Sequence, residues 1–408
     1  MPQLPTPGKL LILALGGLLF TGLLCAQSST DADSLAADLR AYTAFIRQHH
    51  VNPFGSAGPQ AFDSLEAQVL RNLSGRSKEA FVTDIMRLAA LVNDEHTMVW
   101  PQRTAFLPFR VRVVSEGLVI TATDSARSAL ALHRILSIDG LPVAQVIDRF
   151  RPLVKDDNAS YFTEFLHWHL DDPAVLMGLG VIDGFTEIPL ALLSPSGDTL
   201  RTTVPVIVGS APAMHRPPVL AHMLANSSTA NYWSHLDPAD RTLYVQYRRC
   251  QDDPVRPFAA FTDSLFTLID SARPQRLIID LRFNGGGASA VFAPFLRKLR
   301  KSYLNDEGRI RVLIGPGVLS SALMNAVDLK RNTSAVFVGQ LTGANINHHG
   351  ELRTLELPYT GLRVTCSTKW WENWKGMAGG LQPDVEIPET WPDLISGHDR
   401  ALEVARRP

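Results

Sequence analysis

The sequence predicts an α/β protein with an N-terminal helical region, a small β domain and a parallel β-α-β core. Apolar residues follow helical spacing near the N-terminus, short β-like runs separated by turns occupy the middle, and strands alternate with helices in the C-terminal half. The expected divisions are a leader over 1–26, the helical region over 27–100, the β domain over 101–210 and the core over 211–408.

Particular stretches of sequence predict the helices and strands of each region. The helical region rests on helices expected over 35–50 and 78–92. The β domain rests on strands expected over 109–114, 117–123, 133–140 and 187–192, with a helix over 143–154. The core rests on strands over 241–248, 276–282, 309–315 and 335–340, separated by helices over 257–272, 289–301 and 320–331. This last alternation predicts a parallel sheet with crossover helices.

The N-terminal segment has the pattern of a secretory signal peptide. Lys9 precedes the apolar run LLILALGGLLFTGLLCA, and the polar QSST follows it. The run is short and interrupted by glycine, so cleavage after about Ala26 is expected and an uncleaved membrane anchor is the alternative. The bulky Leu24 before Cys25 argues against a lipoprotein. The mature chain is therefore expected to be exported, either periplasmic or secreted, or else associated with a membrane.

The composition of the chain limits which kinds of binding partner can be expected. The chain has 408 residues, of which 45% are hydrophobic and 19% charged, and a formal net charge of -1. This balance gives no reason to expect a nucleic-acid partner. Only Cys250 and Cys366 follow the leader, and two cysteines do not make a disulfide scaffold, so buried free thiols are expected. Nothing in the sequence specifies an oligomeric state.

The run LIIDLRFNGGG, over 277–287, ends an apolar strand in three glycines. Glycine lets a backbone approach a ligand and present its N–H groups, and a helix expected near Ala288 would add the positive end of its dipole. The Walker and dinucleotide-binding patterns are absent. The sequence therefore predicts an oxyanion hole here, with a tight turn that binds nothing as the alternative.

A candidate nucleophile follows the next strand of the core. Ser320 and Ser321 lie in PGVLSSALMNA, where that strand hands over to a helix. A serine at this position is commonly a helix N-cap, which is the competing interpretation. The carboxyl ends of neighbouring parallel strands open into one crevice, however, and this brings a serine close to the glycines.

These blocks resemble the carboxyl-terminal processing (tail-specific) serine protease family and its relative, the tricorn protease core. The resemblance is carried by LIIDLRFNGGG, by VLSSALMNAVDLKRNTSAVFVGQLTGANINHHGE, by LQPDVEIP and, upstream, by VNDEHTMVW. HRILSIDGLPVAQVI is similar to the middle of a PDZ domain. The resemblance implies a PDZ-like β domain and a catalytic core of the crotonase/ClpP-like type.

The resemblance also implies site residues. Ser320 fits the family's nucleophile, with Ser321 as the runner-up, although Leu323 stands where many members have an acid. The oxyanion hole would use the N–H of Ser321 and one from Gly286 or Gly287, with Gly286 preferred. The lysine base of the family is missing, since Asn345 occupies its place in LTGANIN.

The tricorn-like branch uses a histidine base instead. His96 in NDEHT matches that position, and a histidine accepts a proton readily near neutral pH. Its alternative role is to cap the preceding helix. Glu372 in WWENW best matches the branch's assisting glutamate. His348 and His349, just beyond Asn345, are the alternative base, and a polar loop at the rim of the crevice is their alternative role.

The sequence thus predicts an exported serine peptidase that cleaves protein or peptide substrates through a serine acyl-enzyme with a histidine base. No cofactor and no metal are expected. Two alternatives remain: a catalytically dead peptide-binding relative, and a metal-dependent hydrolase built on His348, His349 and Glu351. The sequence has no His-Glu-x-x-His or Cys-x-x-Cys motif that would favour a zinc enzyme.

Overall fold

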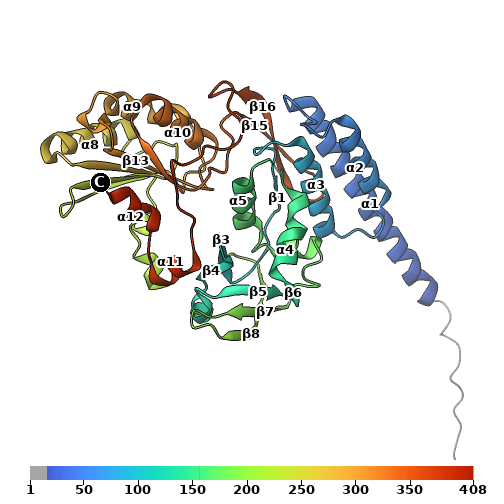
Figure 1. Cartoon of the computed structure of the whole chain (residues 1–408). Helices are drawn as coiled ribbons and strands as arrows, with labels where there is room; N and C mark the ends of the chain where they lie inside the picture. The colour runs from blue at the N-terminus through green and yellow to red at the C-terminus, as the bar shows by residue number, and fades with distance from the viewer. Residues whose placement is uncertain (1–15, 156, 408) are drawn as a thin grey trace, which may run out of the picture.

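The computed structural model describes residues 16–155 and 157–407 and confirms a mixed α/β chain (Figure 1). Three regions can be followed by colour from blue to red. Helices near the N-terminus lie at one side, a sheet drawn in green lies in the middle, and a second sheet with its helices lies at the other side.

The N-terminal region is helical, as predicted. Its helices are α1 (Gly16–His49), α2 (Pro59–Arg71) and α3 (Lys78–Val92). Ser77 caps α3 by accepting from the N–H of Ala80, and Asn93 ends it in the left-handed conformation. α2 was not foreseen, because the turn-rich stretch before it masked its start. The apolar faces of the three helices meet in the main core, where Leu39, Ile46 and Ile85 are fully buried.

The predicted leader lies partly outside the described residues. Residues 1–15 are not described, and residues 16–26 begin α1. No helix in the described part of the chain has the length and apolar character to cross a membrane. Cleavage after Ala26 therefore stays a prediction.

The middle of the chain forms an antiparallel sheet of order β3-β4-β5-β7-β8. Its strands are β3 (Phe109–Val114), β4 (Gly117–Thr123), β5 (Arg134–Ile138), β7 (Glu187–Leu193) and β8 (Thr199–Pro205). The four expected strands are present, and β8 is an addition. The helices of this region are α4 (Val143–Phe150), α5 (Ala159–His169) and α6 (Pro173–Gly178). Its assignment as PDZ-like remains a prediction.

The C-terminal core is built on a sheet of order β10-β11-β12-β13-β14-β17, parallel from β11 onward. Its strands are β10 (Tyr232–Asp237), β11 (Thr242–Tyr247), β12 (Arg276–Asp280), β13 (Ile310–Ile314), β14 (Val336–Gly339) and β17 (Val385–Glu386). Its crossover helices are α8 (Phe258–Ala272), α9 (Ala293–Leu299) and α10 (Ser320–Asn332). The strands that the sequence predicted are confirmed here. On the other face, α12 (Arg400–Arg406) packs against Tyr244, Ile278 and Leu313.

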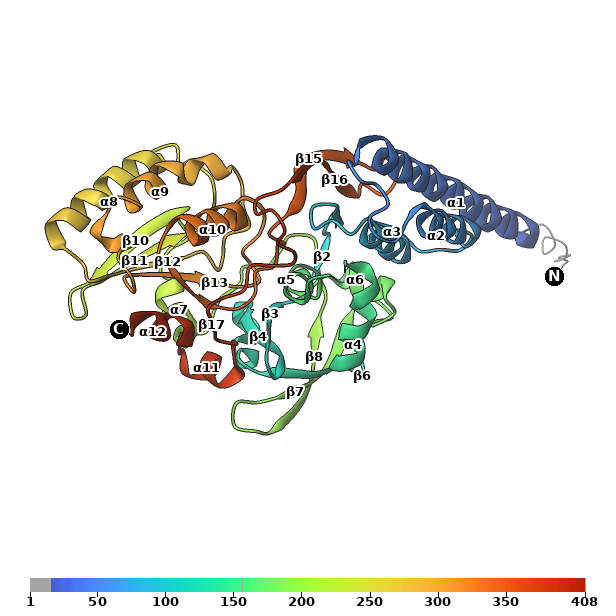
Figure 2. The same cartoon turned by 45° about the horizontal axis from the view of Figure 1, so that its top comes forward.

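A long hairpin joins the core to the N-terminal helices. It consists of β15 (His348–Glu356) and β16 (Arg363–Trp371), and β1 (Val99–Trp100) pairs with β16. Figure 2 shows the hairpin beside α1. The segment that holds His348 and His349 is therefore the start of a strand, not the polar loop that the sequence analysis gave as the alternative. Because β1 directly follows NDEHT, this pairing carries His96 toward the core.

Short elements complete the described chain. They are β2 (Ala105–Phe106), β6 (Leu141–Pro142), β9 (Ile207–Val208), α7 (Pro218–Ala221) and α11 (Trp391–Ser396), with 3-10 turns at Ser125–Leu130, Arg151–Leu153, Leu224–Asn226, Ser289–Phe292 and Tyr303–Asn305. The turn at Ser289–Phe292 replaces the α-helix start that was expected near Ala288. Cys250 and Cys366 are both buried and unpaired, as expected.

Candidate active site

The strand end before the glycines is held by a buried ion-pair network. Asp280 ends β12 and accepts from the Arg282 guanidinium at 2.7 Å and from the Tyr244 hydroxyl at 2.7 Å. Arg282 also pairs with Asp399 at 2.8 Å. Burial opposes the charge of Arg282, but the two carboxylates outweigh it and raise the pKa of Arg282. The network fixes the backbone that leads into the glycine turn.

The glycine turn has a conformation that side chains would not tolerate. Gly286 and Gly287 have φ angles of 106° and 133°. A Cβ atom on Gly286 would lie 2.7 Å from Cβ of Ser320, and one on Gly287 would collide with the carbonyl oxygen of Cys250. The glycines are therefore required for the close approach between this turn and the start of α10.

The N–H groups of the turn are not equivalent. Gly286 donates to Oδ1 of Asn284 at 2.9 Å, so this N–H is not free to bind a ligand. The N–H of Gly287 has no hydrogen-bond acceptor among the described residues. Of the two glycines expected at an oxyanion hole, Gly287 thus has the available donor, and Gly286 provides space for Ser320.

Ser320 begins α10 in a conformation that is rare for serine. Its φ angle is 48°, in the left-handed region, which costs on the order of 1–3 kcal/mol for a residue with a side chain. The N-cap position belongs to Leu319, which makes no side-chain cap bond, so neither serine has the capping role. The Ser320 hydroxyl has no hydrogen-bond partner among the described residues. A strained residue with a free hydroxyl between a strand and a helix is the arrangement of a nucleophile elbow.

Ser321 is committed to the fold. Its hydroxyl donates to the carbonyl oxygen of Gly287 at 2.6 Å, and the residue is buried. This bond ties the helix start to the glycine turn. The N–H of Ser321 has no acceptor among the described residues.

His96 lies beyond the end of α3 and does not cap that helix. Its N–H donates to Oδ1 of Asp94 at 3.0 Å, and its carbonyl oxygen accepts from the Thr365 hydroxyl of β16 at 2.7 Å. The ring is nearly buried, and its Nδ1 atom has no hydrogen-bond partner among the described residues. That atom lies 3.9 Å from Oδ1 of Asp94. The backbone of His96 is thus fixed on both sides, while its ring keeps both nitrogens available.

One cavity of about 400 Å³ contains both His96 and Ser320. We call it the serine cavity. Gly287, Tyr161, Glu95 and Glu351 line it as well. Residues from α3–β1, α5, the glycine turn, α10 and β15 meet here although they are far apart in the sequence. Gly286 and Ser321 do not line the cavity, although each is next in sequence to a residue that does.

The glutamates differ from expectation. Glu372 is exposed just after β16, does not line the serine cavity and makes no interaction within the described chain. Glu95 and Glu351 line the cavity instead, and the sequence analysis gave neither of them a place beside the serine. In the sequence, the feature that could have pointed to Glu95 is its position next to His96. Tyr161 was also missed, and its hydroxyl donates to the Glu95 carbonyl oxygen at 2.8 Å.

His348 and His349 line a different cavity, of about 450 Å³, on the other side of Glu95. His348 stacks on His96 at 5.7 Å between ring centroids, and its Nδ1 atom donates to the carbonyl oxygen of Asn345 at 2.9 Å. Burial lowers the pKa of both His348 and His349. Neither of them lines the cavity that holds Ser320.

The side chain of Asn345 is hydrogen-bonded to two other side chains, and a buried lysine from another segment lies nearby. Its amide donates to Asp157 at 2.9 Å and accepts from Asn158 at 3.0 Å. Lys155 lies in the same region, 3.0 Å from Oε2 of Glu95 and 2.7 Å from Asp157. Burial would lower the pKa of Lys155, but these two carboxylates raise it. A lysine paired in this way is a poor base.

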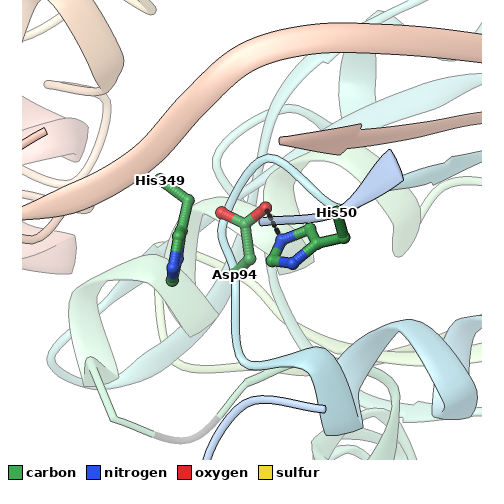
Figure 3. Close-up of side chains that lie close together, drawn as sticks. All are labelled: His50, Asp94 and His349. Carbon is green, nitrogen blue, oxygen red and sulfur yellow. Dashed lines mark hydrogen bonds and ion pairs between the residues drawn. The ribbon is translucent and has the colours of Figure 1, made fainter. Parts of the chain in front are cut away.

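Three possible metal ligands converge at His50, Asp94 and His349, within 4.8 Å of one another (Figure 3). Nδ1 of His50 accepts from the N–H of Asn52, so its Nε2 carries the proton that it donates to Asp94 at 3.1 Å. A metal ion needs the lone pair that this proton occupies. Oδ2 of Asp94 also accepts from the Thr97 hydroxyl at 2.8 Å. The donor set fits a hydrogen-bond network and does not fit a metal ion.

The network keeps Asp94 ionised. Burial would raise the pKa of this carboxyl, but the hydrogen bond from His50, the charge of His96 and the N–H of His96 hold the pKa well below its usual range. His348 and Glu351, the other ligands of the metal alternative, do not join a convergent group in the described part of the chain.

No family model matches the sequence, and no curated protein matches it. Solved structures do match its fold. Mature CPAF complexed with lactacystin is 15% identical with a TM-score of 0.65, covering 92% of this chain and 98% of that one. Mature CPAF without that compound is 16% identical with the same TM-score, covering 92% of this chain and 97% of that one.

A further match is the photosystem II D1 C-terminal processing protease. It is 15% identical with a TM-score of 0.42, covering 87% of this chain and 93% of that one. The chain thus has the fold of mature CPAF.

Proposed function

We propose that the protein is a serine peptidase of the tail-specific type, with Ser320 as nucleophile and His96 as base. The observation that carries this proposal is the serine cavity, which is lined by a serine with φ of 48° and a free hydroxyl, by His96 and by Gly287. The fold shared with mature CPAF supports it.

The proposed reaction follows the chemistry of other serine hydrolases. His96 takes the proton of the Ser320 hydroxyl as the oxygen attacks the peptide carbonyl carbon. The N–H groups of Gly287 and Ser321 donate to the oxyanion that forms. The C–N bond then breaks, and His96 returns the proton to the leaving amine. Water, deprotonated by His96, hydrolyses the acyl-enzyme and restores Ser320.

Asp94 would assist as a positioning residue. Its carboxylate lies on the Nδ1 side of His96 and favours the imidazolium that forms when the ring takes the serine proton. Glu351 and Glu95 lie in the same cavity, where a carboxylate favours the protonated ring or binds a substrate amine. Glu372 is not part of this proposal.

The experiment compares two adjacent serines. Wild-type protein, Ser320→Ala and Ser321→Ala are incubated with unfolded casein, and new N-termini are counted by mass spectrometry. We expect Ser320→Ala to lose cleavage by about a thousandfold or more. Ser321→Ala keeps the backbone N–H and loses one hydrogen bond to Gly287, so activity within about tenfold of wild type is expected.

The two alternatives give different results in this assay. Cleavage that EDTA abolishes and Ser320→Ala retains would favour a metal hydrolase. Absence of any cleavage, with casein still bound, would favour the peptide-binding relative. The apolar N-terminal run supports export to the periplasm or the medium, which detection of a mature N-terminus near Gln27 would test.

A further inference from the structure

A third cavity lies between the β domain and the core. Its volume is about 480 Å³, and Gly285 and Leu319 line both this cavity and the serine cavity. Strand β3 and helix α5 supply one wall, and the segments that follow β12 and β13 supply another. A peptide whose scissile bond lies at Ser320 therefore has room to extend into it. We call it the arginine cavity.

Six arginines line the arginine cavity: Arg110, Arg112, Arg216, Arg248, Arg282 and Arg400. Four of them are neutralised by ion pairs: Arg110 with Asp171, Arg112 with Glu389, Arg282 with Asp399, and Arg400 with Asp393. Arg216 and Arg248 have no carboxylate partner among the described residues. These two guanidinium groups are therefore the arginines of the cavity that have no ion pair within the described chain, and Glu164, which also lines the cavity, contacts His167 instead.

Phe283 lies among these arginines, two residues before Gly285 in the run that ends in the glycine turn. The guanidinium carbons of Arg112, Arg248 and Arg282 lie 5.6, 5.4 and 5.7 Å from the centre of its ring. An aromatic face attracts cations and orients them, but it carries no net charge. The ring therefore gathers arginines beside the active site without neutralising them.

Arg216 faces the same cluster from the segment between the β domain and the core. Its guanidinium makes no hydrogen bond or ion pair within the described chain. Partial desolvation, followed by the charges of Arg112 and Arg248, lowers the pKa of Arg216. Like charges held together in this way are stabilised when an anion binds between them.

We infer that Arg216 and Arg248, beside Phe283, form a subsite for a carboxylate of the peptide substrate. This inference rests on the proposed peptidase function. A guanidinium presents paired N–H donors that match the two oxygens of a carboxylate. The carboxylate comes from an aspartate or glutamate side chain or from the end of the substrate chain, and both sources have the same chemistry.

The experiment measures peptide binding without cleavage. Fluorescein-labelled alanine octapeptide amides carry one glutamate scanned through every position, and a matched set carries glutamine. A third probe is the all-alanine octapeptide with a free terminal carboxylate. Binding to the Ser320→Ala protein is measured by fluorescence anisotropy. We expect a carboxylate at one position, or at the chain end, to improve Kd about tenfold or more over its neutral match.

The variants Arg216→Gln and Arg248→Gln, singly and together in the Ser320→Ala background, should remove this preference and leave glutamine peptides unaffected. Arg249→Gln is the matched control, because Arg249 is adjacent, exposed and outside the cavity. Preference for a glutamate position identifies a side chain as the source, and preference for the free acid identifies the chain end. Equal binding of all three peptide classes would overturn the inference, as would a preference that survives the double variant.

The same outcomes separate the subsite from the peptidase proposal. Carboxylate-dependent binding by a protein whose wild type cleaves no peptide would leave the subsite standing and refute the peptidase. For this comparison the Arg216→Gln/Arg248→Gln double variant is also made with Ser320 intact. Cleavage of glutamate and glutamine peptides with equal kcat/KM by the wild type and by this variant would refute the subsite alone.

Discussion

The Nδ1 atom of His96 lies 3.9 Å from Oδ1 of Asp94, and Asp94 is held from its other side by His50 and Thr97. The separation is too long for a hydrogen bond, so the two groups interact through their charges when the ring is protonated. Asp94 has a fully buried side chain and a lowered pKa, so it keeps its negative charge beside the proposed base. Asp94 does not line the serine cavity, but it places a negative charge beside His96, which lines that cavity together with Ser320.

Asp94→Asn tests the role of this carboxylate. A neutral amide cannot stabilise the imidazolium of His96, so kcat should fall by about a hundredfold or more, with KM changed by less than about threefold. Steady-state kinetics with a fluorogenic peptide measures the two constants separately. Asp84→Asn is the control, because Asp84 is also a buried carboxylate but pairs with Arg76 and Arg87 and makes no ion pair with His96. Loss of kcat in both variants to the same extent would assign the effect to folding.

Gly286→Ala tests the close approach between the glycine turn and α10. The new Cβ would lie 2.7 Å from Cβ of Ser320, and the backbone has φ of 106°, so stability should fall by about 1–3 kcal/mol or more. Gly285→Ala is the matched control, since its Cβ would meet no atom within 4 Å, and its stability should stay within about 0.5 kcal/mol of wild type. Urea unfolding measures both variants. Equal stability in the two variants would show that the turn relaxes freely.

The core could be predicted from the sequence because each strand there is apolar and ends at a turn. Strands β11 to β14 and their helices follow from that alternation, and the serine and glycines follow from where the strands end. The sequence analysis did not predict the hairpin β15–β16, because the outer part of β15, ELRTLE, is mostly exposed and contains mostly polar residues. Without the hairpin the sequence could not show that Glu351, and not Glu372, lies beside Ser320.

The arginine cavity could not be predicted for a different reason. Arg112, Arg216 and Arg248 come from a β-domain strand, a connecting segment and a core strand end, and none of them lies in a recognisable motif. Only the packing of β3 and α5 against the core brings them around Phe283. The resemblance already preferred Ser320 over Ser321, but the physical reason, that the hydroxyl of Ser321 donates to the carbonyl oxygen of Gly287, depends on the packing of α10 against the glycine turn.

His169→Phe tests a pH effect on stability. Burial, and then the charge of Arg103, lowers the pKa of His169 to about 3, against about 6.5 in an unfolded chain. Between these values the unfolded chain binds a proton that the folded chain does not. Stability is therefore full above pH of about 6.5 and falls by about 1.4 kcal/mol for each unit as the pH drops. The ring packs against Phe165 with centroids 4.5 Å apart, so phenylalanine fits there.

Urea unfolding at several pH values between about 7.5 and 4 measures this effect. In the variant, the slope of the unfolding free energy against pH should decrease by about the contribution of one proton. The contribution of His348 and His349, whose pKa values are also lowered by burial, should remain. An unchanged slope would show that His169 is not buried as a neutral ring.

The central claim, that Ser320 is the nucleophile of a serine peptidase, is tested most directly by labelling with a fluorophosphonate. The wild-type protein is treated with the reagent, digested, and the modified residue is located by tandem mass spectrometry. We expect one adduct on Ser320, formed at least about a hundredfold more slowly in His96→Ala because the base is missing. An adduct on Ser321 or another residue, or no adduct in a protein that cleaves casein, would contradict the claim.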